Sequence, residues 1–523
     1  MEPASLTAGL QQAGYATPAA VAVISLVSSV YFMKKLVVNK EKANCNLRLV
    51  PAVPGLPVIG NLLQLTEKKP HKTFANWVET YGPMYSIKTG SSSVIVVNTT
   101  DLAKEAMVTK FSSMPTRKLP KSLSVLSMDK TMVALADYDD YYKMVKRHLL
   151  TNMLSPSAQK RHISNRDVMV DNLSARLSVH TKSHPEQALD FRKTFESELF
   201  GLSMKQGIGK DVECIYVEEL GATFSKEEIF RILVLDPMEG AIEVDWRDFF
   251  PYLSWIPNHG YEDKVVHTHH RKQTVMNALI KEQKQRIASG KVIDCYLDYL
   301  LSEAKNLTDL QMLVLIWETI VETSDTTLVT SEWAMYELAK NPDLQERLFR
   351  EIQTVCGSEK LTEQHLSKIP YLSAVFHETL RRHSAVPILP FRHVGVDTEL
   401  GGYHIPAGTE IAVNVYGCNM DSEKWERPEE WSPERFLNGK SDPMELHKTM
   451  AFGMGKRACA GALQAMLIAC TSIGRMVQQF AWRIKEGEED KVDTMSLTSK
   501  KLEPLQVFIK SRQGVGENEI HIG

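Results

Sequence analysis

The stretch Phe452-Gly453-Met454-Gly455-Lys456-Arg457-Ala458-Cys459-Ala460-Gly461 decides the fold assignment of this chain. Two glycines precede its cysteine and one follows it, and glycine permits positive φ and close approach of backbone to a flat ligand. An amphipathic helix is predicted from Ala462 to Gln478. A thiolate just before a helix is stabilised by the helix dipole and by free N–H groups. The stretch therefore predicts that Cys459 ligates a metal, with Arg457 close enough to neutralise a carboxylate on the ligand.

Two other interpretations of this stretch remain open at this point. The spacing Gly453-x-Gly455-x-x-Ala458 loosely fits a dinucleotide-binding fingerprint, which should follow a strand and open a βαβ unit. No βαβ pattern surrounds it. A buried cysteine with a purely structural role is the second alternative.

A second unusual segment lies in the middle of a long predicted helix. Thr308-Asp309-Leu310-Gln311 is a capping-box pattern, apolar residues recur from Met312 to Leu338, and Asn341-Pro342 marks the end. Polar residues occupy positions 322 to 327, as Glu-Thr-Ser-Asp-Thr-Thr. Consecutive positions cover every face of a helix, and buried polar groups are unfavourable unless hydrogen-bonded. The segment therefore indicates a function.

Composition limits the classes of protein to consider. The 523 residues are 43% hydrophobic and 24% charged, and the net charge of -3 argues against a nucleic-acid-binding protein. Seven cysteines are scattered without a Cys-x-x-Cys pair, which argues against a disulfide framework and a structural zinc site. A reducing compartment fits this cysteine usage.

The N-terminus predicts a membrane anchor. No charged residue occurs from Pro3 to Met33, and residues 16–33 are apolar enough for a short transmembrane helix. The basic residues follow this stretch, which is unlike a cleaved signal peptide and places the rest of the chain in the cytosol. A disordered leader or a transit peptide is the alternative. We predict a leader (1–15), an anchor (16–33), a basic, proline-rich hinge (34–61), one domain (62–512) and a tail (513–523).

The cysteine stretch resembles the haem-binding loop of the cytochrome P-450 family. Two further elements match the family: Glu378-Thr379-Leu380-Arg381 resembles its Glu-x-x-Arg pair, and Pro433-Glu434-Arg435-Phe436 its Pro-Glu-Arg-Phe segment. The order and spacing of these elements also agree. The resemblance implies a mainly α fold with small β-sheets, in which strand-like runs occur at 84–89, 93–98 and 410–415.

The resemblance also implies roles for individual residues. Cys459 would be the axial ligand of the iron of haem b. Phe452, Gly453 and Arg457 would surround the haem, and Arg392 and Lys146 would bind its propionates. Lys146 and Tyr142 depart from the Trp-x-x-x-Arg of the family, and lysine lacks the guanidinium fork. Glu378, Arg381 and Arg435 would form a structural triad.

The polar helix segment corresponds to the oxygen-activating segment of the family. Asp325 and Thr326 would form the acid–alcohol pair that delivers protons to bound oxygen. Glu322 and Thr323 replace the small residues that the family has there. Electrons would come from NADPH through NADPH–cytochrome P-450 reductase. A basic face for this reductase could be formed by Lys143, Lys146, Arg147, Lys448 and Lys456, and ordinary solvated surface is the alternative.

Longer segments look like the plant ent-kaurene oxidases, namely residues 143–147, 243–255 and 415–421. That resemblance implies three successive oxidations of one methyl group of ent-kaurene to ent-kaurenoic acid, on the route to gibberellins. The substrate would be a lipophilic diterpene, and the membrane that of the endoplasmic reticulum or the plastid outer envelope. Another labdane-related diterpene is the alternative substrate, and a haem protein without redox activity is a remote alternative.

Overall fold

The computed structural model describes residues 47–65, 69–290, 295–437, 442–495 and 497–512. The predicted leader, the predicted anchor and the predicted tail lie outside these residues. Within the described ranges, no helix is both long enough and apolar enough to cross a membrane. The anchor at residues 16–33 therefore stays a prediction.

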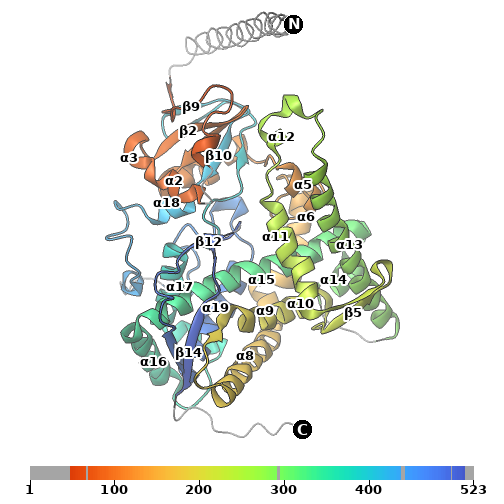
Figure 1. Ribbon diagram of the computed structural model, residues 1–523, viewed down its shortest axis with the longest axis vertical. Helices are drawn as coiled ribbons and strands as arrows, with labels where there is room; N and C mark the ends of the chain where they lie inside the picture. Colours follow the sequence, from red (N-terminus) through yellow and green to blue (C-terminus); the bar gives the residue numbers. More distant parts are fainter. Residues whose placement is uncertain (1–46, 66–68, 291–294, 438–441, 496, 513–523) are drawn as a thin grey trace, which may run out of the picture.

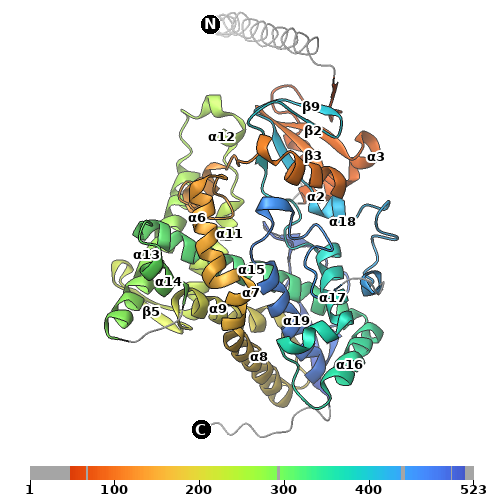
Figure 2. The same cartoon turned by 180° about the vertical axis from the view of Figure 1, so that it is seen from behind.

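Helices make up most of the described chain, as predicted, and they form the larger part of the molecule in Figures 1 and 2. The longer ones are α6 (Asp140–Leu149), α8 (Ile163–Ser183), α9 (Phe191–Ile208), α13 (His259–Ala288), α14 (Tyr296–Glu303), α15 (Asp309–Lys340), α16 (Pro342–Cys356), α17 (Pro370–Arg382) and α19 (Ala462–Gln479). Shorter helices include α5 (Lys121–Leu126), α7 (Pro156–Arg161) and α12 (Trp246–Phe249).

Helix α15 runs through the middle of the helical body and spans 32 residues (Figure 1). Its capping box forms as predicted. The N–H of Gln311 donates to Thr308 Oγ1 over 3.1 Å, and the N–H of Thr308 donates to Gln311 Oε1 over 2.9 Å. Two apolar clusters flank the helix, one around Trp317 and one around Trp333. The polar segment of α15 therefore lies deep in the molecule.

Two of the small sheets, those of β9 and of β2 and β10, lie at one end of the molecule, while β5, β12 and β14 lie elsewhere, as Figure 1 shows. The predicted hairpin forms β2 (Met84–Thr89) and β3 (Ser92–Val97), and β10 (Glu410–Val413) pairs parallel to β3 with Ile411 opposite Ile95. Strand β7 (Arg392–His393) completes this sheet, so Arg392 lies at its edge. The remaining strands are β1 (Arg48–Leu49), β4 (Leu189–Asp190), β5 (Cys214–Val217), β6 (Ala222–Ser225), β8 (Thr398–Leu400), β9 (Tyr403–Ile405), β11 (Phe480–Ile484), β12 (Thr494–Met495), β13 (Lys500–Lys501) and β14 (Gln506–Ser511).

The described part of the proline-rich segment packs onto these sheets. Strand β1 pairs with β9, the N–H of Val53 donates to the carbonyl of Ser86 over 2.9 Å, and that of Asn61 to the carbonyl of Lys88 over 2.7 Å. The extended backbone thus finds hydrogen-bond partners at the exposed edge of β2. Residues 48–61 are consequently held against the domain that was predicted to begin at residue 62.

Candidate active site

The loop around Cys459 is closed by backbone contacts and by glycine geometry. The N–H of Cys459 donates to the carbonyl of Phe452 over 2.9 Å. Gly453 and Gly455 both have positive φ, at 64° and 71°. A Cβ on Gly455 would lie 2.8 Å from the carbonyl oxygen of Met107, so another residue there would push two segments apart. Helix α19 begins three residues after the cysteine, and the N–H groups of Gly461 and Ala462 approach the sulfur.

An opening inside the protein separates this loop from α15. Most of α15 is buried, yet Glu322 is exposed and Thr323 and Thr326 are partly exposed, on one face of the helix. Cys459 is also exposed, but burial in the surrounding protein, followed by the charge of Glu322, raises the pKa of its thiol to about 11. Side chains that are accessible and still strongly desolvated line an internal cavity. We call this cavity, lined by Glu322, Thr323, Thr326 and Cys459, the Cys459 chamber.

Three arginines crowd together beside the cysteine loop. Arg117 and Arg392 are 8% and 6% exposed, and Arg457 is half-buried. Burial, and then the charges of Arg392 and Arg457, lower the pKa of Arg117 well below its usual range. Burial and the charge of Arg457 likewise lower the pKa of Arg392 to about 10. The three guanidinium groups therefore lie close enough to repel one another.

These arginines lack acidic partners in the described part of the chain. None of them forms an ion pair with a carboxylate, and buried nitrogens of each have no hydrogen-bond partner there, namely Arg117 Nε, Arg392 Nη1, Arg457 Nε and Arg457 Nη1. Arg457 does donate to the backbone carbonyls of Pro115 and Ala136 and packs on the ring of Tyr142 at 4.4 Å. Buried cations without counter-charges indicate that an anionic ligand belongs beside them.

A haem fits this arrangement. Its two propionates are carboxylates that guanidinium groups bind with two parallel hydrogen bonds, and its iron accepts one axial thiolate. Within the described residues, no group of three or more His, Cys, Asp or Glu side chains could hold a bare metal ion. A single cysteine suits a metal that arrives with its own four-nitrogen ring. The residues present thus match the ligand that the sequence predicted.

The predicted triad is brought together completely. Arg381 binds both carboxylate oxygens of Glu378, each over 2.8 Å, and Arg435 Nε lies 3.3 Å from Glu378 Oε1. Glu378 and Arg381 are fully buried. The remaining N–H groups of both arginines donate to main-chain carbonyls between residues 419 and 430, and the N–H of Ser432 donates to Glu378 over 2.8 Å. This network fastens the 419–435 segment to α17.

The structure separates the environments of Asp325 and Thr326. Thr326 faces the Cys459 chamber and donates to the carbonyl of Glu322 over 3.1 Å. Asp325 is 4% exposed and lies 4.0 Å from the ammonium of Lys500 on β13. Burial raises the pKa of Asp325, and the charge of Lys500 opposes that shift. The carboxyl thus lies between the helix and a cationic side chain, while the hydroxyl lies at the chamber. Their role in proton delivery stays a prediction.

Lys146 contacts the rim of the cysteine loop. Its ammonium donates to the hydroxyl of Tyr142 over 3.0 Å and to the carbonyl of Lys456 over 2.9 Å, and Tyr142 donates to the same carbonyl over 3.1 Å. These bonds tie α6 to the loop. Direct binding of a propionate by Lys146 remains a prediction.

Two residues of the site were missed by sequence reasoning. Arg117 belongs to no recognisable pattern, and only the fold brings it to Arg392 and Arg457. Glu318 precedes Glu322 by one helical turn, and its carboxylate accepts hydrogen bonds from the N–H groups of Val133 (2.8 Å) and Ala134 (2.7 Å). The spacing of Glu318 and Glu322 on one helix face was a signal that could have been noticed.

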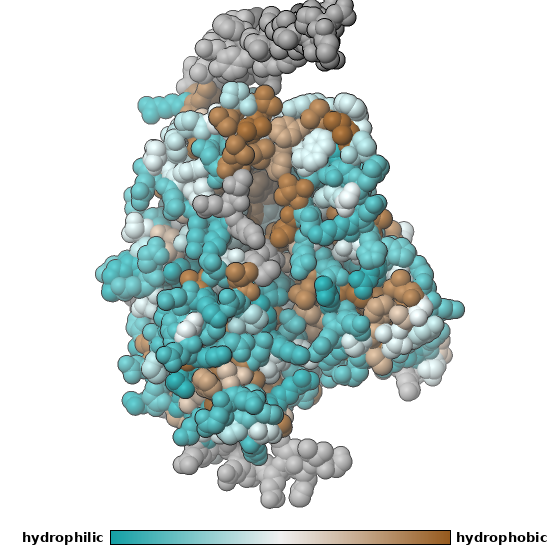
Figure 3. All heavy atoms as spheres, in the orientation of Figure 1, coloured by the Kyte–Doolittle hydropathy of each residue, from teal (hydrophilic) through white to brown (hydrophobic). Residues whose placement is uncertain are grey.

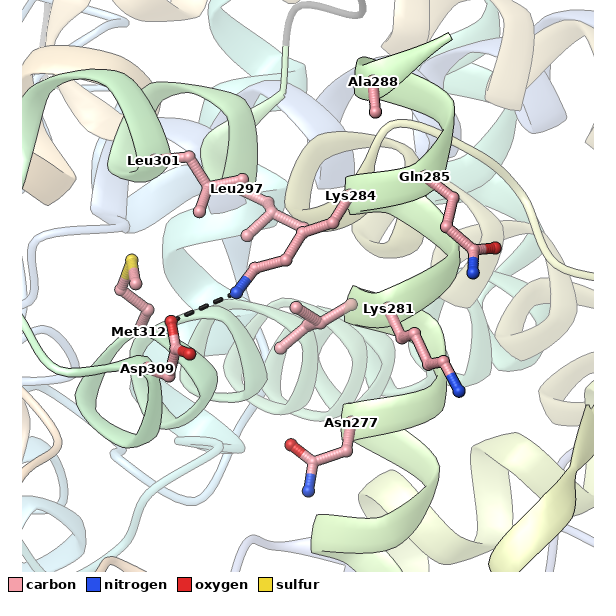
Figure 4. A pocket seen from close by; sticks show the side chains of 10 residues that line it. Asn277, Lys281, Lys284, Gln285, Ala288, Leu297, Leu301, Asp309 and Met312 are labelled. Atoms are coloured by element: carbon pink, nitrogen blue, oxygen red, sulfur yellow. Dashed lines mark hydrogen bonds and ion pairs between the residues drawn. The ribbon is translucent and has the colours of Figure 1, made fainter.

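A surface pocket of about 460 Å³ lies elsewhere, between α13, α14 and the start of α15 (Figure 4). An ion pair between Lys284 and Asp309, 3.1 Å long, crosses it. None of the residues that line it was predicted to belong to the active site.

Comparisons with known proteins agree with this geometry. The family model for Cytochrome P450 matches residues 51–507. An ent-kaurene oxidase from Salvia miltiorrhiza is 58% identical over 503 residues, covering 95% of this chain and 97% of that enzyme. An ent-sandaracopimaradiene 3-hydroxylase from Oryza sativa subsp. japonica is 54% identical over 464 residues, covering 88% of this chain and 91% of that enzyme.

A solved structure supports the fold. A zebra fish cytochrome P450 determined with progesterone superposes with a TM-score of 0.70 at 20% identity, covering 84% of this chain and 99% of that one. The predicted fold is therefore confirmed in its mainly helical body and small sheets. This chain belongs to the cytochrome P450 family, as a haem-dependent monooxygenase that receives electrons from a redox partner.

Proposed function

We propose that this chain oxidises one methyl group of ent-kaurene, through the alcohol and the aldehyde, to ent-kaurenoic acid. The observation that carries the proposal is the 58% identity, over nearly the full length of both chains, to the Salvia ent-kaurene oxidase. The Cys459 chamber is consistent with it, because the side chains that line it are strongly desolvated. A buried site of this kind suits a hydrocarbon substrate without polar groups.

Haem b would be held by residues from four parts of the chain. Cys459 would ligate the iron, Phe452 and Gly453 would lie against the ring, and Arg392, Arg457 and Lys146 would face the propionates, joined by Arg117. When bound, the haem supplies the activation of dioxygen with electrons from NADPH. The N–H groups of Gly461 and Ala462 would stabilise the thiolate form of Cys459, which burial alone disfavours.

Protons would reach the chamber through α15. Thr326 presents its hydroxyl to the chamber, and Asp325 holds a carboxyl of raised pKa between α15 and Lys500. A carboxyl whose pKa lies above its usual range is a better proton donor at neutral pH than an ordinary aspartate. Asp325 would therefore take up protons from the Lys500 side, and Thr326 would pass them on.

The face outside the cysteine loop suits an acidic reductase. Lys143, Arg147 and Lys456 are exposed there, and Lys456 packs its ammonium over the rings of Phe111 and Tyr138. Lys146 ties this face to the loop. Complementary charge accelerates the association of such partners. We assign this face to NADPH–cytochrome P-450 reductase.

A membrane location is supported by apolar side chains on the surface at the end of the molecule that carries β9 and α12 (Figure 3). Large apolar side chains are exposed on two segments, namely Leu56, Val58, Leu63, Val244, Tyr252 and Trp255. The N–H of Ser91 donates to the carbonyl of Phe249 over 2.9 Å, so the β2–β3 turn and the α12 region adjoin. With an anchor at 16–33, this surface would rest on the endoplasmic reticulum or the plastid outer envelope, with the domain in the cytosol.

A second substrate is favoured by one comparison. The rice relative named ent-sandaracopimaradiene 3-hydroxylase is 54% identical, nearly as similar as the Salvia enzyme. An apolar pocket distinguishes hydrocarbons that differ by one methylene by only about 1–3 kcal/mol. Identity at this level therefore leaves another labdane-related diterpene as the alternative substrate.

The test combines the chain with a plant reductase in membranes and supplies ent-kaurene, NADPH and dioxygen. We expect the alcohol, the aldehyde and then the acid to appear in order. Efficient hydroxylation of ent-sandaracopimaradiene without ent-kaurenoic acid would identify the alternative. A Cys459→Ser variant should lose the reduced carbon-monoxide Soret band typical of thiolate ligation, and retention of that band would refute the ligand assignment.

A further inference from the structure

An acidic pair occupies the face of α15 that borders the Cys459 chamber. Glu322 is exposed to the chamber, and Glu318 lies one turn earlier and is 2% exposed. Glu318 is fixed by the backbone N–H groups of Val133 and Ala134, at 2.8 and 2.7 Å. The carboxyl groups of the two acids lie close enough to shift each other's pKa. Glu318 is thus anchored by the Val133–Ala134 backbone, and Glu322 lies beside it on the same face of α15.

Burial favours the protonated form of both acids. Neither acid forms an ion pair with a cationic side chain among the described residues. Burial, reinforced by the negative charge of its neighbour, raises the pKa of Glu318, and burial raises the pKa of Glu322 to about 7. Two carboxyl groups that share a proton can both donate and accept a hydrogen bond.

The other polar groups at the chamber are already engaged. Thr323 Oγ1 accepts a hydrogen bond from Gln464 over 3.2 Å, and Thr326 donates to the carbonyl of Glu322. Arg117, Arg392 and Arg457 would bind the propionates of the haem. The Glu322 carboxyl is therefore the polar group best placed to meet a substrate.

The Glu322 carboxyl disfavours binding of a hydrocarbon and favours binding of an oxidised product. ent-Kaurene offers it no hydrogen bond, so binding the hydrocarbon leaves the carboxyl without a partner from the substrate. The alcohol and the aldehyde both carry an oxygen atom that it can bond. The contribution of Glu322 therefore begins only after the first oxidation.

We propose that Glu322 is a positioning residue that retains the partly oxidised substrate. Its carboxyl, oriented by Glu318, hydrogen-bonds the oxygen atom that the first oxidation introduces. This bond keeps the alcohol and the aldehyde in the chamber until the next oxidation begins, and it points the oxidised carbon back to the same position. The inference rests on the proposed function, because it assumes a substrate that is oxidised more than once.

The test measures binding separately from turnover. The haem-loaded parent protein, Glu322→Ala and Glu322→Gln are titrated with ent-kaurene and with its alcohol, and the shift of the Soret band gives each Kd. We expect Glu322→Ala to bind the alcohol about tenfold more weakly, the loss expected for one buried hydrogen bond of about 1.4 kcal/mol, and to bind ent-kaurene at least as tightly as the parent. Glu322→Gln, which keeps a hydrogen-bonding group, should lose less.

Turnover and control variants complete the design. In time courses, Glu322→Ala should release free alcohol, whereas the parent accumulates the acid. If Glu322→Ala fails to take up haem, Glu322→Leu removes the carboxyl while filling its volume and decides the same question. Val321→Ala, a buried neighbour on α15, should leave the ratio of the two Kd values unchanged.

The outcomes separate the two claims. An unchanged ratio of alcohol to hydrocarbon Kd in Glu322→Ala or Glu322→Leu overturns the retention role and leaves the proposed function intact. A parent protein that oxidises no ent-kaurene overturns the proposed function and this inference together.

Discussion

Two groups of buried arginines in this protein behave in opposite ways. Arg381 and Arg435 share the carboxylate of Glu378, and their other N–H groups donate to main-chain carbonyls. Arg117, Arg392 and Arg457 face one another with unpartnered nitrogens and without ion pairs in the described ranges. The first group finds its charge and hydrogen-bond partners within the protein. The second group needs a bound anion to supply those partners.

The difference distinguishes arginines that stabilise the fold from arginines that need an anionic ligand as their counter-charge. A buried ion pair whose hydrogen bonds are all made fixes a local structure, and removing one partner leaves a buried charge without compensation. Unpaired buried cations weaken the folded state until a counter-charge arrives. Truncating an arginine should therefore have different effects on the two groups, and the following predictions test that expectation.

Arg381→Ala should have the largest effect. It leaves Glu378 buried and short of its principal partner, and losses of about 3–5 kcal/mol in the free energy of unfolding are typical of such changes. Urea unfolding of the purified protein measures the loss, and we expect little haem to be retained. Arg382→Ala is the matched control, because Arg382 is the next residue on α17, is only partly buried and donates to the carbonyl of Glu429. Equal losses in both variants would contradict the special role of the triad.

Arg392→Met should lower the affinity for haem without lowering the thermal stability of the apoprotein. It removes one of three mutually repelling charges, and buried Arg392 Nη1 has no partner among the described residues. Loss of a charged hydrogen bond to a propionate corresponds to about 1.5–3 kcal/mol, or roughly 10- to 150-fold in haem affinity. Transfer of haem to excess apomyoglobin measures retention, and thermal unfolding measures the apoprotein. An apoprotein that unfolds at lower temperature than the parent would place Arg392 with the structural residues.

Arg435→Lys should have an intermediate effect on stability. Lysine keeps the positive charge near Glu378 but cannot reproduce the fork that contacts Glu378 and the carbonyls of Arg427 and Glu430. We expect a loss of about 1–2 kcal/mol in the free energy of unfolding. Arg435→Met, which also removes the charge, should lose more in the same urea titration. If the two variants are equally stable, the charge of Arg435 contributes nothing.

Lys146→Ala should have the smallest effect, because this lysine is partly exposed and bonds a hydroxyl and a carbonyl at the loop rim. We expect haem affinity to change by less than about fivefold, in line with partly exposed charges. The haem-transfer assay applies here as well. A loss as large as that of Arg392→Met would show that Lys146 binds a propionate directly.

Sequence reasoning succeeded where the signal is local. The capping box at Thr308 and Gln311, the hairpin around Gly90 and the Glu378–Arg381 pair all depend on residues within a few positions of one another. Local geometry fixes such contacts before any tertiary packing is known. The mainly helical fold with small sheets could be predicted for the same reason.

Contacts between distant segments could not be predicted. Arg117 meets Arg392 from 275 positions away (392 − 117), Asp325 meets Lys500, and Glu318 meets the backbone of Val133. Each depends on how whole elements pack, which periodicity does not specify. The packing of residues 48–61 onto β2 and β9 was missed for a similar reason, because a proline-rich hinge was predicted there without a partner for its backbone.

The arginine group also bears on how much enzyme a cell can keep. A ligand that binds only the folded chain stabilises it in proportion to the logarithm of its free concentration. Newly made protein is therefore less stable, and more open to proteases, until haem reaches it. We expect the cellular lifetime of this protein to increase with the supply of haem, so that haem synthesis affects the abundance of the enzyme in addition to transcription.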